Sequence, residues 1–598
     1  MNKKIIPLLI CGTFMMGAQA VEKSVEVSSA RLSVSKAKTD VLGRHNSKVQ
    51  NTPQAYVKNM KPMALAKAAD YPSEVAIRKT VGEFRYKAFK GSKKYILDGD
   101  TISESTYTSR INQIEQNDDP RFNFVYSYSV NFPTYGSNYN FATQGAVSPC
   151  ANQTFCEADI LTHRYGQAEH ITFMTVPYVA QNLSKLGPLY NKGAQGNNIG
   201  IHFLDVGVPS AGFVPSNKLT IEADCAPSTY VDNKIAWATK VARTMNAVAP
   251  GATIHAYSTN CNDYSRYGDI AVPVDAFYKT PQIHVGSLTP SGQSGNTTYG
   301  DISSAIDEII YQTRIIEFAG AGDEGLFAGN PNQLSQFAMG VNVITVGAVH
   351  NNGLTYHQTS SWKNAAYPVR VNESLSGASY IKPEIANFSD FFFPDARQYN
   401  ITVPNQHSPF QMNPYYLQTS AASAYTAASV ALLLEKYPFY RWHPEVVKAL
   451  LLTSSSKPIS QAWQHDDDNG IFARNHLNDS LLIGKNRSRF WNGNNEDFFV
   501  NNQPITFTEK DIKANKTYRV AIAWLSSGVY IKNSGVLPQD IDIRVMQNGT
   551  QIGSSRSEDN AYELVEFTTN SASNVEIIIS RHRNRGGRVL LGYNFAEI

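Results

Sequence analysis

The sequence predicts an α/β protein: a doubly wound parallel sheet with an N-terminal extension and a C-terminal β-sandwich. Between about residues 190 and 460, short apolar segments alternate with segments of helical periodicity, the pattern of a parallel sheet covered by helices on both faces. From residue 496 the pattern changes to short alternating strands with turn signals, which indicates an antiparallel sandwich. A chain of 598 residues is long enough for roughly two to four domains.

The expected elements of the parallel sheet follow from apolar runs and helical periodicity. Strands are expected at 199–205, 253–257, 282–287, 315–319 and 343–349, with helices at 232–247 and 301–314 and a helical lead-in at 171–189. Asp205 and Asp323 then fall at or just beyond the carboxyl ends of strands, where the functional sites of such sheets gather. In the sandwich, strands are expected at 517–524, 541–547, 564–569, 574–581 and 589–595, after a linker at 461–495.

Composition argues against several classes of partner. A formal net charge of +3 gives no reason to expect nucleic acid or an acidic membrane surface. No segment beyond the N-terminus offers about 18 consecutive apolar residues, so membrane insertion is not expected. No cofactor is indicated and no metal ligands are assigned. The acidic run at 466–470 favours a solvated turn over a calcium loop. A structural calcium ion elsewhere in the chain is possible but is not assigned to any residues. The oligomeric state is unknown.

The first 20 residues have the pattern of a Sec-type signal peptide. Two lysines precede a short apolar run, and small residues at 18 and 20 form a cleavage pattern. We therefore expect a secreted or periplasmic bacterial protein. Residues 21–120 are polar and weakly periodic, which fits either a flexible extension or a propeptide.

The cysteines agree with export. One of the five falls inside the expected signal peptide, and the other four are Cys150, Cys156, Cys225 and Cys261. Two disulfides are plausible in an oxidising compartment. Proximity favours pairing Cys150 with Cys156 and Cys225 with Cys261, although three pairings remain open. The spacings are not those of a structural zinc site.

The segment 417–438 predicts a buried helix of small residues that ends at Pro438, which cannot continue a helix without strain. Thr419 and Ser420 lie at its start. Unpaired N–H groups and the helix dipole favour negative charge there, so Ser420 is a candidate nucleophile. The alternative is that Thr419 and Ser420 only cap the helix.

Together with five other segments, this helix resembles the subtilisin-like serine proteases (peptidase family S8). The segments are 198–208, 247–252, 319–325, 342–349 and 382–385. The resemblance covers about half the chain, with the peptidase domain expected at 121–460, and it implies a catalytic Asp205, a nucleophilic Ser420 and substrate binding by Ser287 and Leu288. Residues 496–598 look like the jelly-roll domain that follows the catalytic domain in some secreted relatives.

Two positions depart from the family's chemistry. The catalytic His position is occupied by Trp237, whose indole N–H is only a hydrogen-bond donor, and loss of the base from such a triad costs about 10⁶ in turnover. The oxyanion Asn position is occupied by Asp323, and loss of an oxyanion donor costs roughly 10² to 10³. Gln418 also replaces a glycine of the nucleophile motif.

These departures favour a secreted protease homologue with impaired or lost activity that retains a peptide-binding cleft. The alternative is an active serine endopeptidase in which Ser420 uses an unconventional base. Lys240, one helical turn from Trp237, is one candidate for such a base, although an ordinary lysine on a helix is the simpler interpretation. The other candidates are His202, His255, His284 and His407. A second alternative is a surface-binding protein that acts through its C-terminal domain.

Overall fold

The computed structural model describes Ile96–Leu97, Asp100–Thr101, residues 155–161 and most of 168–598. The internal segments outside the described part are 185, 206, 211, 224–231, 259–280, 287–298, 324–333, 336, 352–356, 358–359, 362–364, 367–378, 395–399, 402–409, 412–414, 455–486, 495–498 and 586–587. The expected signal peptide and most of the expected N-terminal extension therefore lie outside it. Within the described part of the chain, no helix is both long and apolar enough to cross a membrane.

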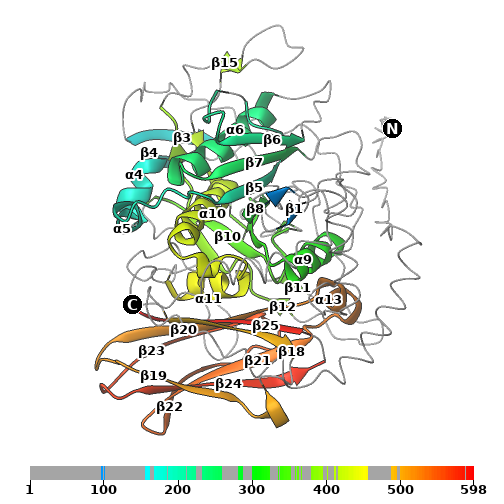
Figure 1. The fold of residues 1–598 in the computed structure, drawn as a ribbon. Helices are drawn as coiled ribbons and strands as arrows, with labels where there is room; N and C mark the ends of the chain where they lie inside the picture. The colour runs from blue at the N-terminus through cyan, green and yellow to red at the C-terminus, as the bar shows by residue number, and fades with distance from the viewer. Residues whose placement is uncertain are drawn as a thin grey trace, which may run out of the picture.

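A parallel sheet of seven strands forms the centre of the larger domain (Figure 1). Its strand order is β13-β10-β9-β8-β5-β7-β6. The strands are β5 (Gly200–Asp205), β6 (Leu219–Ala223), β7 (Thr253–Ser258), β8 (Pro281–Gly286), β9 (Ile316–Gly320), β10 (Ile344–Val349) and β13 (Ile385–Phe388). All five strands expected from the sequence form, and the strand order reverses beside β5, so Asp205 ends a strand at the switch point.

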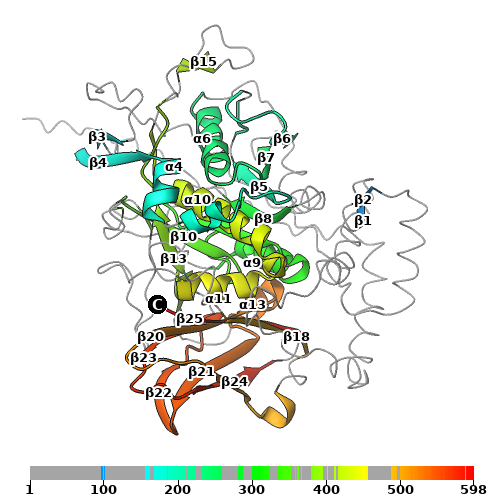
Figure 2. The same ribbon diagram turned by 60° about the vertical axis from the view of Figure 1, so that its left-hand side comes forward.

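Helices cover both faces of this sheet, as expected. On one face, α10 (Gln418–Lys436) packs beside α6 (Asp232–Val248) and crosses the central strands (Figure 2). On the other face lies α9 (Asp301–Thr313), whose Ile306 and Ile310 pack in a second apolar cluster. Val446 and Leu450 of α11 (Pro444–Ser454) pack in the cluster that contains α10. Every residue from Gln418 to Leu434 is buried, because the small side chains of α10 let the helix approach the strands closely.

A smaller sheet lies beside the central one, and one of its strands leads directly into α10. Its order is β17-β14-β4-β3, formed by β17 (Tyr415–Tyr416), β14 (Phe391–Phe392), β4 (Ala168–Thr175) and β3 (Phe155–Leu161). The prediction of a helical segment at 171–189 is therefore wrong at its start: 171–175 complete β4, and the helices α4 (Val176–Tyr178), η2 (Val179–Leu183) and α5 (Gly187–Asn191) follow. The pairing of β4 with β3 and β14 outweighs the local helical pattern.

The C-terminal region contains two four-stranded antiparallel sheets, ordered β18-β25-β20-β23 and β19-β24-β21-β22, which is the strand order of a jelly roll. The strands are β18 (Arg487–Asn494), β19 (Ile505–Glu509), β20 (Thr517–Leu525), β21 (Gln539–Gln547), β22 (Thr550–Ser555), β23 (Tyr562–Thr568), β24 (Val575–Asn584) and β25 (Arg588–Glu597). β18 lies inside the predicted linker, so the boundary at 496 is too late.

The two regions share one apolar core, which includes residues of α9, the ends of β5 and β9, and both C-terminal sheets. In Figure 1, α11 lies between the central sheet and β20 and β25. Gly592 of β25 meets the α11 main chain so closely that a Cβ there would lie 2.4 Å from Glu445 C. The short helix α13 (Gly528–Ser534) packs on α9, and Ser304 Oγ donates to Gly528 O at 2.9 Å.

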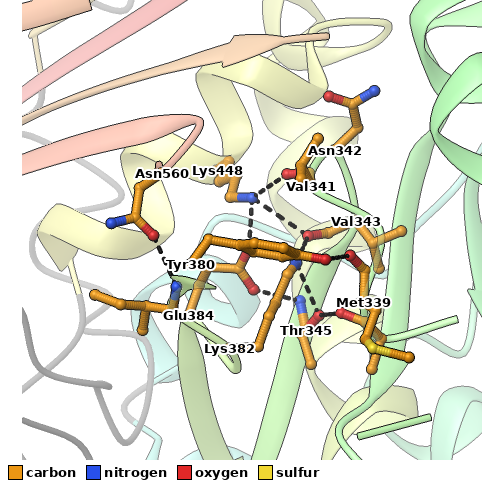
Figure 3. A network of polar contacts seen from close by, with 12 residues as sticks. Met339, Val341, Asn342, Val343, Thr345, Tyr380, Lys382, Glu384, Lys448 and Asn560 are labelled. Carbon is orange, nitrogen blue, oxygen red and sulfur yellow. Dashed lines mark hydrogen bonds and ion pairs between the residues drawn. The ribbon is translucent and has the colours of Figure 1, made fainter. Parts of the chain in front are cut away.

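A buried charged network lies at this junction (Figure 3). Glu384 Oε1 is 2.7 Å from Lys382 Nζ and 2.5 Å from Lys448 Nζ. Lys448 also donates to Val341 O at 2.8 Å. Burial lowers the pKa of Lys382 to about 8 against the pull of Glu384, while the two lysines outweigh burial and hold the pKa of Glu384 below its ordinary value. Asn560 of the sandwich accepts from Ile381 N at 2.8 Å and completes the contact.

Candidate active site

Asp205 is the last residue of β5 and is only 2% exposed. Side chains alternate along a strand, so Asp205 shares a face with Ile201 and Phe203, which pack in the same cluster as the α10 alanines. His202 points to the opposite face, where its ring stacks on that of His255 with centroids 5.0 Å apart. Neither histidine therefore serves as a base on the α10 face.

The side chains of the other two histidines considered as bases lie outside the described part of the chain. The main chain of His284 is in register with that of His202, and residue 407 lies outside the described part of the chain.

Ser420 lies in the first turn of α10 and is 1% exposed. The helix begins after Leu417, which provides no side-chain cap. Gln418 has a φ of +78°, a left-handed conformation that suits the glycine expected at this position in the subtilisin pattern. Gln418 thus adopts a main-chain conformation that ordinarily favours glycine.

Asp323 lies beyond the end of β9 and bonds to the start of α10. Its Oδ1 accepts hydrogen bonds from Thr419 N and Thr419 Oγ1, both at 3.0 Å. Gly322 N donates to the same hydroxyl at 3.2 Å. A Cβ on Gly320 would lie 2.9 Å from Thr419 Oγ1, so this close approach requires glycine. The capping hypothesis is therefore corrected for Thr419: Asp323 supplies the acceptor, and Thr419 donates to it. For Ser420 it stays a prediction.

Tyr416 links the remaining site positions. Its ring meets that of Trp237 edge-on, with centroids 5.0 Å apart. Burial, then the carboxylates of Asp205 and Asp323, raise the pKa of Tyr416 well above its ordinary value, so its phenol stays neutral. Within the described part of the chain, its hydroxyl has no hydrogen-bond partner. Asp205, Trp237 and Asp323 are thus brought around one buried tyrosine.

Sequence reasoning did not find Tyr416. It lies four residues before Ser420, outside the motif that carries the subtilisin resemblance, and no spacing pattern marks it. Its position comes from the pairing of β17 with β14, in which Tyr416 lies opposite Phe391.

Lys240 lies close to the aromatic pair of Trp237 and Tyr416. Its Nζ donates to Tyr415 O at 2.7 Å and lies 6.0 Å from the centroid of the Trp237 ring. Burial lowers the pKa of Lys240 to about 7, so a large fraction of the amine is neutral near neutral pH. The structure thus brings Lys240 to the wall of the site, where it also supports the β17 main chain.

The other candidate residues are not described well enough to place. Ser287 and Leu288 lie outside the described residues, as do Cys150, Cys225 and Cys261. Of Cys156, the described part includes only the main chain, in β3. Substrate binding and both disulfides remain predictions.

The structure thus places Asp205 at the end of the switch-point strand and Ser420 in the first turn of a buried helix. Residues 229–482 match the model of the subtilase family, Peptidase_S8. This match confirms the resemblance to the subtilisin-like serine proteases.

Solved structures provide two further comparisons. The chain is similar to fervidolysin from Fervidobacterium pennivorans, a keratinolytic enzyme related to subtilisin, with 15% identity, 66% of this chain and 53% of that chain covered, and a TM-score of 0.33. It is also similar to a serine protease of Aeromonas sobria, with 13% identity, coverages of 68% and 89%, and a TM-score of 0.32. The chain therefore spans about half the length of fervidolysin. A search of curated proteins finds no match.

Proposed function

We propose that the chain is an exported subtilase-family protease homologue that has lost peptide hydrolysis and retains a peptide-binding cleft. The observation that carries the proposal is the contact of Trp237 with Tyr416. In this proposal Trp237 occupies the position of the general base, beside the neutral phenol of Tyr416, and neither group accepts a proton from a serine hydroxyl at neutral pH.

The surroundings of Ser420 support the same conclusion. Asp205 keeps its place, but without an imidazole it has no base to orient. Oδ1 of Asp323 is an acceptor for Thr419, whereas an oxyanion needs a donor. Together the two changes remove the proton acceptor and weaken charge stabilisation, while the main chain of the nucleophile turn is kept.

The remaining parts of the chain fit a binding role in this proposal. Residues 1–20 direct export, Ser287 and Leu288 contact an extended peptide, and the disulfides form after export. The jelly roll supports the peptidase-like domain, because the two share a core. This shared core favours a supporting role for the jelly roll over independent surface binding.

The second candidate is an active serine endopeptidase with Lys240 as its base. The observation that favours it is the pKa of Lys240, lowered by burial to about 7, since a neutral amine is able to accept a proton from serine. Against this role, Lys240 Nζ is held by Tyr415 O. A base must be within hydrogen-bond reach of the proton that it removes.

The test compares the exported full-length protein with its Ser420→Ala and Lys240→Met variants. Cleavage of a mixed peptide library is followed by mass spectrometry, and Ser420 reactivity by fluorophosphonate labelling. We expect the wild type to match Ser420→Ala in both assays. Wild-type cleavage that Ser420→Ala abolishes would overturn the loss of activity, and its abolition by Lys240→Met as well would favour the second candidate.

Peptide binding is tested separately with Ser420→Ala, which removes any cleavage. Enrichment of particular peptides from the same library on the immobilised variant is the expected result. A variant that retains no peptide would refute the binding cleft, whatever the hydrolysis assay gives.

A further inference from the structure

A second cluster of chemically active side chains lies near the β10 and β13 end of the central sheet. His350 directly follows β10, Asp390 lies between β13 and β14, and His357 belongs to the segment after β10. One nitrogen of each imidazole and a carboxylate oxygen all lie within 4.8 Å of one another. Within the described residues, this is the one group of three or more His, Cys, Asp or Glu side chains with that spacing.

The distances are close to those of a shared metal ion. His350 Nδ1 is 2.8 Å from Asp390 Oδ2, and His357 Nε2 is 3.8 Å from Asp390 Oδ1. Ligand atoms at about 2.0–2.1 Å from a tetrahedral zinc ion are roughly 3.3 Å apart. The two observed separations, each to a different oxygen of the carboxylate, lie on either side of this value. The two rings are also adjacent, with centroids 4.6 Å apart.

The main chain around the cluster is held in place. His357 N donates to Ala348 O at 3.0 Å, and Asp390 O accepts from Asn351 Nδ2 at 2.7 Å. The Asp390 carboxylate is oriented by Ser389 Oγ, which donates to Oδ1 at 3.1 Å. Outer contacts of this kind fix the direction of metal ligands and raise their affinity.

Burial separates this cluster from an ordinary surface group of charges. The side chains of His357 and Asp390 are 0% and 1% exposed, whereas that of His350 is 15% exposed and gives access from solvent. Beside Asp390, the buried Oδ1 of Asn351 accepts no hydrogen bond within the described part of the chain. It is available to a water molecule on a metal.

We propose that His350, His357 and Asp390 bind one transition-metal dication of the zinc class. Two imidazoles and a carboxylate suit zinc and its first-row neighbours, whereas calcium and magnesium prefer sites made only of oxygen. Three protein ligands leave a fourth position for water. The ion ties the end of β10 to the connection between β13 and β14, which the parallel pairing of β10 with β13 brings together.

The experiment measures zinc binding to the metal-free full-length protein by titration calorimetry, beside the His350→Ala, Asp390→Asn and His582→Ala variants. His582 is an exposed histidine of β24 and provides the matched control. We expect one zinc ion per chain in the wild type and in His582→Ala. Loss of an outer contact alone weakens metal sites about 10- to 100-fold, so loss of a ligand in His350→Ala is expected to weaken binding at least 100-fold.

Cobalt substitution identifies the ligands. A cobalt complex with visible tetrahedral bands and without thiolate charge transfer is the expected result. Absence of binding at micromolar zinc, binding that survives His350→Ala, or a thiolate band that assigns the ion to cysteines would each overturn the proposal. His350 is partly exposed, so its variant is expected to fold. Metal binding can therefore be measured in His350→Ala even if Asp390→Asn is unstable.

Discussion

Asp323 Oδ1 accepts hydrogen bonds from both the main-chain nitrogen and the side-chain hydroxyl of Thr419, each at 3.0 Å. The carboxylate therefore satisfies a donor at the N-terminus of α10, where a negative charge is favourable. In the subtilisin pattern this position is occupied by an asparagine that donates to substrate. Here Asp323 instead stabilises the start of the helix that carries Ser420.

Replacement of Asp323 by alanine is expected to lower the free energy of unfolding by about 1 kcal/mol, the typical effect of losing a helix cap. Asp323→Asn keeps an oxygen acceptor and loses only the charge, so its effect should be smaller. Urea denaturation of both variants checks the order. An alanine variant as stable as the wild type would show that the two bonds do not stabilise α10.

A buried lysine makes the stability of the protein depend on pH. Burial lowers the pKa of Lys240 from 10.5 to about 7. Between these values the unfolded chain binds a proton on Lys240 that the folded chain does not, so stability rises with pH through this window. The contribution is up to about 1.4 kcal/mol per pH unit. Lys240→Met should abolish this rise.

The measurement compares urea denaturation at pH 7, 8 and 9 for the wild type, Lys240→Met and the control Lys192→Met. Lys192 is exposed, so its variant should keep the wild-type slope. If Lys240→Met also keeps that slope, Lys240 remains charged in the folded protein and its burial has been compensated by other groups.

The central sheet could be predicted because strands buried on both faces are mostly apolar, as β9 and β10 are apart from Glu317 and Thr345. Asp205 and Ser420 were found because the motif places them at the ends of such elements. Two edge strands, β6 and β18, were missed for the opposite reason. β6 and β18 each pair on one side only, and the polar residues of β18 read as a linker.

The rest of the site depends on contacts between distant segments. The Trp237 ring on α6 contacts the Tyr416 ring on β17. These residues are far apart in the sequence, and no spacing pattern predicts their contact. The same holds for His350 and Asp390, which are 40 residues apart and meet because β10 and β13 are parallel neighbours. Local patterns predict elements, whereas such pairs require the register of the sheet.

The buried network at the domain junction contains two lysines and one carboxylate in direct contact. Variants of the different residues are therefore expected to lose different amounts of stability. Glu384→Gln leaves Lys382 and Lys448 buried without their counter-ion, and breaking a buried pair in this way costs about 3–5 kcal/mol. Lys448→Met keeps the pair of Lys382 with Glu384, so it should cost less. Denaturation of the two variants gives the order, and a larger loss for Lys448→Met would contradict it.

The contact between Gly592 and α11 predicts that the two domains depend on each other. A Cβ at position 592 would lie 2.4 Å from Glu445 C and 2.5 Å from Glu445 O, so Gly592→Ala must push β25 away from the helix. Overpacking of this kind costs about 1–3 kcal/mol. The control is Gly187→Ala, where the nearest atom to the new Cβ is 3.9 Å away and the effect should stay within about 0.5 kcal/mol.

Calorimetry distinguishes two consequences of Gly592→Ala. Because residues of both domains share one core, we expect the wild type and Gly187→Ala to unfold in a single transition. Gly592→Ala should unfold at a lower temperature or in two transitions, since β25 is the strand that contacts α11 most extensively. A single transition at the wild-type temperature would mean that the jelly roll adjusts its position on α11 at no cost, and that the domain behind Ser420 does not rely on it.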